Sequence, residues 1–283
     1  MTSRWIVVPA VVLCLLTGTA RLARAQFYSV TNNNSHIDIS YVAVAGHDEN
    51  GLIGWHVDNV SQLVQQWYWF RLAGVNNGNQ SSLNDIWVLD ASTPNPNQVY
   101  LRFSSEDPFE VHLLYTLTGG ALGSDHSVIT EQLTITNTGA TALAPLTWFE
   151  YTDLDLSGPL STFDDWASGG VTGITQQDNL RIATVTHSLT PDRYEITATN
   201  VYNWILFDKL DDSSTAYNLS NLGSPSNTGD VTFAFQWDLT IAAGESVTFT
   251  TTKEVNLIPE PGTLLLLGLG LVGLIAAHSR RQN

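Results

Sequence analysis

Apolar and polar positions alternate along most of the chain between residues 26 and 258. Successive side chains of a β-strand point to opposite faces, so this alternation predicts strands that bury one face. Turn-forming clusters such as Asn76-Asn77-Gly78 separate the alternating stretches. The predicted strands cover residues 36–45, 98–103, 109–117, 127–137, 146–154, 180–187, 193–199, 203–207, 230–239 and 246–254.

The stretch 60–69 fits two kinds of element. Val60, Leu63, Val64 and Trp67 would share one face of a short helix, followed by a strand over residues 67–72. The rest of the body predicts no long amphipathic helix, and it has no repeat of fixed period that would favour a solenoid or a propeller. Ten or more strands without a long helix predict an all-β fold, a large antiparallel β-sandwich.

The N-terminus has the pattern of a cleavable signal peptide over residues 1–25. Arg4 precedes a largely apolar run over 5–16, and the small residues Ala23 and Ala25 come just before Gln26. A retained membrane anchor is the alternative, but the run is short for a bilayer span. We expect cleavage before Gln26, and the chain's single cysteine, Cys14, would leave with this segment. The mature chain would then have no disulfide, no cysteine metal site and no thiol catalysis.

The C-terminus predicts a single transmembrane helix. An uncharged apolar run over 262–277 follows Pro259-Glu260-Pro261 and precedes Arg280 and Arg281. The arginine pair would hold the C-terminus in the cytoplasm and the body outside. A buried core helix is the alternative, but such a helix shows a polar face and this run has none.

These C-terminal features together resemble the PEP-CTERM sorting signal of exported Gram-negative bacterial proteins. The resemblance covers about 25 residues and implies recognition by a membrane protease called exosortase, with cleavage near Pro259-Glu260-Pro261 and transfer to the cell surface. It carries no information about the body. The predicted organisation is a signal peptide (1–25), a β-sandwich ectodomain (26–258) and a sorting signal (259–283).

The charge of the body limits its partners. Residues 26–258 hold 26 acidic and 6 basic side chains, a net charge of −20. Such a surface excludes nucleic acid as a partner and repels acidic polymers, but it attracts divalent cations.

Four aspartates form the candidate metal site. Asp153 and Asp155 alternate along a predicted strand, and Asp164 and Asp165 follow in a loop, so their oxygens would suit Ca²⁺. The alternative is a solvated acidic edge, and no other cofactor is predicted.

Four tryptophans form the candidate sugar-stacking platform: Trp55, Trp67, Trp69 and Trp87. Stacking requires rings that are open to solvent. The alternative is that these rings fill the core, since large aromatic side chains bury area that a chain without disulfides needs.

The body itself resembles large antiparallel sandwiches only loosely. The alternating segment 128–139, followed by Pro145-Leu146-Thr147-Trp148, is similar to paired strands of mutarotase-like and carbohydrate-binding folds. A glycosidase would need two facing carboxylates, and Glu110, Glu131 and Glu150 lie on predicted strands. No recognisable catalytic motif accompanies them, so we predict no catalytic residue and no enzymatic activity.

These observations predict an exported protein, transiently anchored in the inner membrane and then delivered to the cell surface or beyond. Its predicted role is structural or adhesive, with exopolysaccharide as the partner. A carbohydrate-binding module is the alternative, followed by a carbohydrate-active enzyme of mutarotase-like fold.

Overall fold

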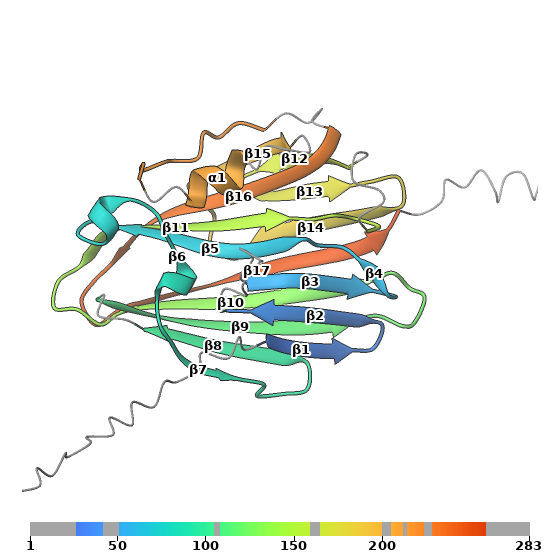
Figure 1. Ribbon diagram of the computed structural model, residues 1–283, viewed down its shortest axis with the longest axis horizontal. Coiled ribbons are helices and arrows are strands. Elements are labelled where there is room, and N and C mark those ends of the chain that lie inside the picture. Colours follow the sequence, from blue (N-terminus) through green and yellow to red (C-terminus); the bar gives the residue numbers. More distant parts are fainter. Residues whose placement is uncertain are drawn as a thin grey trace, which may run out of the picture.

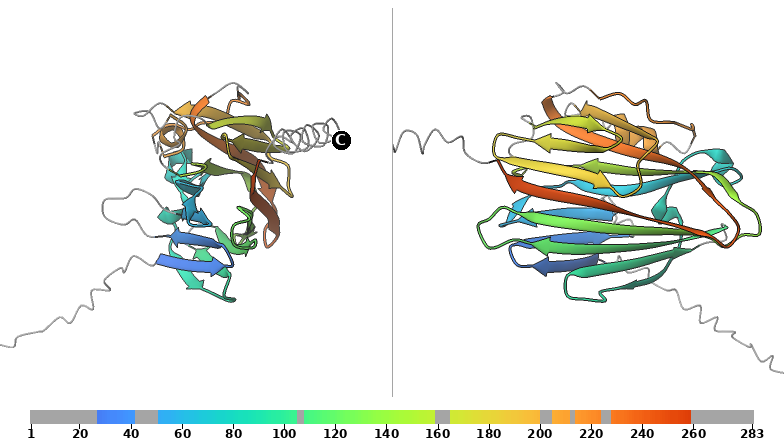
Figure 2. Two further views of the ribbon diagram at one scale, coloured as in Figure 1. Left: turned by 90° about the vertical axis from the view of Figure 1, so that its right-hand side faces the viewer. Right: turned by 180° about the vertical axis from the view of Figure 1, so that it is seen from behind.

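Strands pair antiparallel in two layers that lie face to face (Figure 1; Figure 2, left) in the computed structural model. The structure describes residues 27–41, 51–104, 108–158, 165–199, 205–211, 214–223 and 228–258. The predicted signal peptide and the predicted membrane span lie outside these ranges. Within them, no helix is long and apolar enough to cross a membrane.

The first layer contains the N-terminal strands. Its spatial order is β1 (Phe27–Asn32), β2 (Ser35–Ser40), β3 (Gly51–Val57), β5 (Gln65–Leu72), β11 (Leu143–Asp153), β16 (Thr228–Ile241) and β15 (Arg193–Thr199). The short strands β4 (Val60–Ser61) and β6 (Ser81–Ser82) pair with β3 and β5. The 3-10 turns η1 (Asn76–Gly78) and η2 (Leu83–Asp85) follow β5.

The second layer, viewed from outside in the right panel of Figure 2, contains the C-terminal strand. Its order is β7 (Val88–Ser92), β8 (Gln98–Ser104), β9 (Phe109–Gly119), β10 (Ser127–Asn137), β17 (Ser246–Leu257), β14 (Arg181–His187), β13 (Gly173–Gln177) and β12 (Asp165–Gly170). The layers join where β12 pairs with the start of β16. The predicted all-β antiparallel sandwich is confirmed for the described residues.

Aromatic rings from both layers fill the space between them. Phe70 of β5 meets Phe109 of β9 edge-on, with 5.1 Å between ring centroids. Trp237 of β16 packs against Phe249 of β17 at 4.9 Å. Trp55 of β3 is fully buried, and its indole N–H donates a hydrogen bond of 3.0 Å to Ser127 Oγ on β10. The core therefore gains both apolar burial and polar links between the layers.

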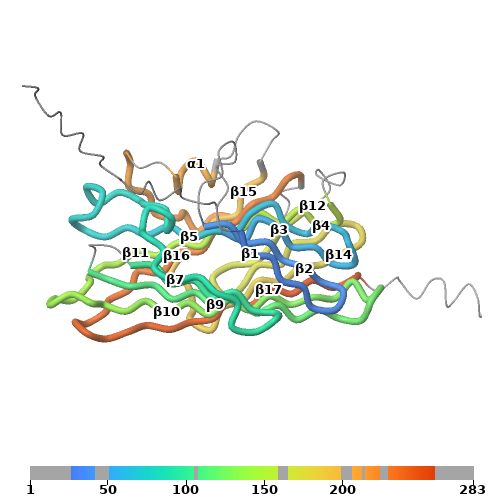
Figure 3. Tube along the Cα trace, turned by 60° about the horizontal axis from the view of Figure 1, so that its bottom comes forward, coloured from blue at the N-terminus to red at the C-terminus, as the bar shows by residue number. Residues whose placement is uncertain are grey.

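The strand predicted over 203–207 is wrong, because the structure has a short helix, α1 (Ile205–Asp211), at this place. Leu206 and Leu210 are buried four residues apart, which is helical spacing, whereas five residues are too few to show a period of two. Phe207 of α1 contacts Trp69 and Tyr151, so the helix covers the outer side of the first layer (Figure 3).

The ambiguous stretch 60–69 contains β4 and the first part of β5, joined by residues 62–64, so its helical alternative is wrong. β5 is buried on both faces from Gln65 to Phe70, with the second layer on one side and α1 against Trp69 on the other. A strand that is covered on both faces loses the alternation by which strands are recognised.

A buried carboxyl group lies where the layers join. Asp165, at the start of β12, accepts a hydrogen bond of 2.7 Å from Gln176 Nε2 and is almost fully buried. Burial raises the pKa of Asp165 from 3.8 to about 8, which outweighs the hydrogen bond that favours the charged form. The folded protein therefore binds a proton there at pH values where the unfolded chain has released it.

Replacing Asp165 with asparagine should make stability less dependent on pH. The raised pKa means that the wild-type carboxyl is compatible with folding below about pH 4 and increasingly costly as the pH rises towards about 8. We expect urea unfolding to show that the wild type loses at least about 1 kcal/mol more than Asp165→Asn between about pH 5 and pH 9. Parallel pH profiles for the two proteins would contradict this assignment.

Replacing Trp55 with alanine should destabilise the protein by about 3–5 kcal/mol, because it leaves a large cavity between the layers. Trp87→Ala is the matched control, since that ring is exposed, and its effect should stay within about 0.5 kcal/mol. Chemical denaturation followed by circular dichroism measures both. Similar losses for the two variants would show that the core has been misplaced.

Candidate functional site

The outer face of β8, β9 and β10 carries polar side chains in a regular pattern. Val99, Leu101 and Phe103 of β8 point inward and are fully buried, so the alternate residues Tyr100 and Arg102 point outward. The same alternation runs along β9 and β10. The hydrophobic pattern that builds the core therefore also builds this outer surface.

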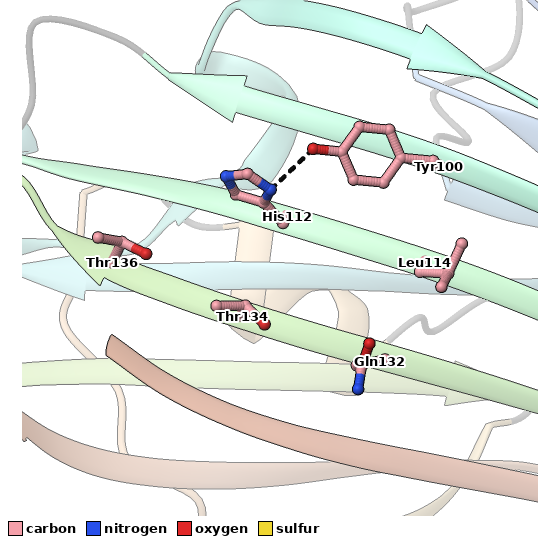
Figure 4. Close-up of a pocket in the computed structure, with 6 residues that line it drawn as sticks. All are labelled: Tyr100, His112, Leu114, Gln132, Thr134 and Thr136. Atoms are coloured by element: carbon pink, nitrogen blue, oxygen red, sulfur yellow. Dashed lines mark hydrogen bonds between the residues drawn. The ribbon is translucent and has the colours of Figure 1, made fainter. Parts of the chain in front are cut away.

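Six outward side chains line a cavity of about 260 Å³ on this face (Figure 4). The strand register sets Tyr100, Leu114 and Gln132 side by side on three neighbouring strands, with His112 and Thr134 in the next row. The lining consists of Tyr100, His112, Leu114, Gln132, Thr134 and Thr136. Five of the six residues carry a polar group, and none is a carboxylate.

A chain of hydrogen bonds fixes the rings beside this cavity. Arg102 donates from Nε and from a terminal nitrogen to Glu110, at 2.7 and 2.8 Å. Glu110 Oε1, which accepts from Arg102 Nε, also contacts His112 Nε2, and His112 Nδ1 lies 2.7 Å from the hydroxyl of Tyr100. The hydrogen bond from Arg102 lowers the pKa of Glu110, so this carboxylate stays ionised and accepts a hydrogen bond from the N–H at His112 Nε2. In neutral His112, Nδ1 then accepts from Tyr100.

Burial raises the pKa of Tyr100, so its hydroxyl keeps its proton. Side chains held in this way need little reordering when they bind a ligand. The arrangement offers hydroxyl, imidazole and amide groups for hydrogen bonding. Arg102 and Glu110 neutralise each other, so the cavity has little net charge on an acidic protein.

Of the four candidate stacking tryptophans, Trp87 alone is exposed, at 78%. Trp55, Trp67 and Trp69 are buried in the core, so the stacking hypothesis is wrong for these three rings because a sugar cannot reach them. Trp87 precedes β7, and its carbonyl oxygen accepts a hydrogen bond of 3.0 Å from the Ser104 N–H. Because Ser104 pairs with Glu110, Trp87 lies at the same end of the sheet as the Arg102–Glu110 pair.

The candidate calcium ligands lie around the end of β11 and the start of β12, where Gln176 Nε2 donates to both the Leu154 carbonyl oxygen and Asp165 Oδ2. Asp153 ends β11, Asp155 lies in the turn that follows it, and Asp165 begins β12; all three are buried. Asp164 lies outside the described residues. Within the described ranges, no three His, Cys, Asp or Glu side chains group so that they could hold a metal ion. Calcium binding therefore stays a prediction.

The three candidate glutamates occupy two different places. Glu110 lies on the outer face, whereas Glu131 of β10 and Glu150 of β11 meet between the layers with no exposed side-chain surface. Lys253 of β17 lies between them, and its Nζ is 2.6 Å from an oxygen of each carboxylate. An enclosed pair of carboxylates does not flank an open substrate cavity, which a glycosidase would require.

Sequence reasoning missed several residues that the structure brings together. Lys253 lies on the same inward face of β17 as Phe249, Thr251 and Val255. A lysine in this alternating set was the sequence signal that could have indicated a buried charge. Tyr100 gave no comparable signal. Its partner His112 looked like one of several scattered histidines, because only the pairing of β8 with β9 sets the two side by side.

Comparison with known proteins identifies one motif and supports the fold. A PEP-CTERM protein-sorting motif matches residues 257–281. No curated protein matches the chain. Two solved structures share the fold at 9% and 11% sequence identity, with TM-scores of 0.54 and 0.50.

The first of these structures is a bacterial glucoamylase complexed with acarbose, and the second is the Slr1438 protein from Synechocystis sp. PCC 6803. The match to the glucoamylase covers 87% of this chain but 35% of that chain, so this chain spans about a third of the glucoamylase's length. The match to the Slr1438 protein covers 83% of this chain and 97% of that chain. The chain thus carries a PEP-CTERM sorting motif directly behind an antiparallel β-sandwich.

Proposed function

We propose that this protein is sorted to the cell surface by exosortase and binds a neutral polysaccharide chain through the outer face of β8, β9 and β10. Its role is adhesive or structural, within an exopolysaccharide matrix. The observation that carries the binding proposal is the polar cavity lined by Tyr100, His112 and Gln132, with the exposed ring of Trp87 at the same end of the sheet.

The chemistry of the cavity fits a sugar. A sugar ring presents hydroxyl groups that both donate and accept hydrogen bonds, and an apolar C–H face that packs on an aromatic ring. Hydroxyl, imidazole and amide groups line the cavity, and Trp87 offers an exposed ring at the end of the sheet where Arg102 pairs with Glu110. The shared fold with a glucoamylase complexed with acarbose is compatible with this substrate class.

Charge favours a neutral chain over an acidic one. The body carries a net charge of −20, which repels uronate polymers at moderate ionic strength. The one arginine beside the cavity, Arg102, is already paired with Glu110 through two hydrogen bonds. Binding without turnover is the simpler function, since the cavity lining includes no carboxylate.

The sorting motif follows the body without a long linker. The Ile258 N–H still donates to the Leu180 carbonyl oxygen at 2.8 Å, and Pro259-Glu260-Pro261 comes next in the chain. On this proposal, a signal peptide directs export and the apolar run 262–277 anchors the protein transiently in the inner membrane. The folded body then lies outside the membrane, and it stays anchored there until the motif is cleaved.

Replacing Pro259-Glu260-Pro261 with three alanines should keep the protein in the inner membrane, because the processing protease loses its recognition sequence. Fractionation of producing cells, with immunoblotting, measures this. Deletion of residues 262–283 is the control, and it should release a soluble product into the periplasm. Normal surface delivery of the alanine variant would overturn the sorting proposal.

Tyr100→Ala and Trp87→Ala should each weaken binding of neutral glycans at least about tenfold, equivalent to about 1.4 kcal/mol. A glycan array identifies the ligand, and affinity electrophoresis with that glycan measures the loss. Thr186→Ala is the matched control, because Thr186 is exposed on β14 of the same layer, away from the cavity. The proposal fails if no neutral glycan binds, or if both substitutions leave affinity unchanged.

A further inference from the structure

A lysine and two glutamates meet in the interior, apart from the candidate glycan site. Lys253 and Glu131 are diagonal neighbours on the inner faces of β17 and β10, because Glu131 pairs with Thr251, two residues before Lys253. Glu150 reaches them from β11 of the opposite layer. All three side chains are completely buried, and Lys253 Nζ is 2.6 Å from an oxygen of each carboxylate.

The two carboxylates have different surroundings. The second oxygen of Glu131 accepts a hydrogen bond of 2.5 Å from the Tyr68 hydroxyl. The second oxygen of Glu150 accepts one of 2.8 Å from Thr251 Oγ1 and lies 3.2 Å from His187 Nε2. Glu150 thus has partners on both oxygens that stabilise its charge, whereas Glu131 has a single neutral partner besides the lysine.

These surroundings give the two carboxyl groups different pKa values. Burial raises the pKa of Glu131 to about 6, although the charge of Lys253 opposes this. Burial would also raise the pKa of Glu150, but the charge of Lys253 and the hydrogen bond from His187 lower it to about 2. Glu131 is therefore the acid that more readily becomes neutral, and Glu150 is the one that stays an anion. Glu150 Oε1 lies 2.6 Å from Lys253 Nζ, where it can receive a proton directly.

We propose that Lys253 and Glu131 join through an intramolecular amide bond, formed between Nζ and Cδ, with Glu150 as the proton carrier. A neutral amine is a nucleophile, and a protonated carboxyl group held at contact distance is its acceptor. The pairing needs no cofactor and no outside reagent. It would place a covalent cross-link inside a chain whose predicted mature form contains no cysteine.

The step balances in atoms and charge. The Lys253 ammonium first passes one proton to the Glu131 carboxylate, which gives a neutral amine and a neutral acid. The nitrogen lone pair then attacks Cδ, and the electron pair of the carbonyl bond moves to the oxygen, where the Tyr68 hydroxyl can donate a hydrogen bond. Glu150 takes the second proton from nitrogen and returns it to the departing hydroxyl. One amide and one water form, and Glu150 is an anion again.

The cross-link would strengthen the strand that carries the C-terminal motif. β17 runs directly into residues 257–281, so a force on a protein held at its C-terminus acts first on the pairing of β17 with its neighbours. Hydrogen bonds between β17 and β10 can then break one after another. A covalent bond from residue 253 to residue 131 would hold β17 on β10 when those hydrogen bonds break.

The test uses the full chain, expressed in cells and purified as the folded product. Tryptic digestion followed by mass spectrometry should give one species that joins the peptide of Glu131 to the peptide of Lys253, lighter than their sum by one water. Lys209 and Lys253 are the chain's two lysines, so amine labelling of the denatured protein should modify Lys209 and leave Lys253 unmodified. Separate peptides with a labelled Lys253 would overturn the proposal, and a link to Glu150 would overturn its assignment to Glu131.

Three variants separate chemistry from folding. Lys209→Arg is the matched control: Lys209 is partly exposed and paired with Glu195, and the water loss should persist in this variant. Lys253→Met should give unlinked peptides, and Glu150→Gln should leave most of the chain unlinked because the proton carrier is gone. A full cross-link in Glu150→Gln would contradict the role given to that residue. If a core variant fails to fold, the wild-type peptide masses still decide the question.

Discussion

Burial of a lysine between two glutamates constrains the register of the whole sandwich. Taking three charged groups out of water is costly unless they meet with good geometry, and Lys253, Glu131 and Glu150 do so from three strands of two layers. A slip of one residue in β17 would turn Lys253 to the outside and leave two carboxylates buried without their cation. The aromatic core supplies most of the burial, but these charges favour one alignment of the strands within it.

The same alignment of strands determines the outer surface. Side chains alternate between the two faces of a strand, so Lys253 and Glu131 point inward while their neighbours Thr252 and Gln132 point outward. The register of the core therefore also decides which polar groups meet on the outer face. On β8 and β9 the same rule sets Tyr100 beside His112 and Arg102 beside Glu110. The strands whose inward residues form the core thus carry the candidate glycan site on their outward residues, and no loop is needed to build it.

Position and charge link the fold to export. β17 lies in the middle of the second layer, between β10 and β14, and it also leads directly into the sorting motif. The C-terminal attachment is therefore made to a central strand rather than to an edge. The acidic body repels other copies of itself, which suits a protein that is exported through the cell envelope. A core built from aromatic rings and buried ion pairs gives stability that does not depend on disulfides.

The sequence by itself determined the class of fold, the sorting motif and many strand positions, because alternation and short linear motifs are local properties. The strands 127–137 and 193–199 were predicted to the residue. Tertiary structure alone decided what α1 would be, which tryptophan stays exposed, and that Glu131 and Glu150 share Lys253. These outcomes depend on strands paired across more than a hundred residues, such as β10 with β17, and on the second layer and α1, which cover opposite faces of β5. A local pattern shows which side chains share a face, but only the pairing of distant strands decides which of them meet.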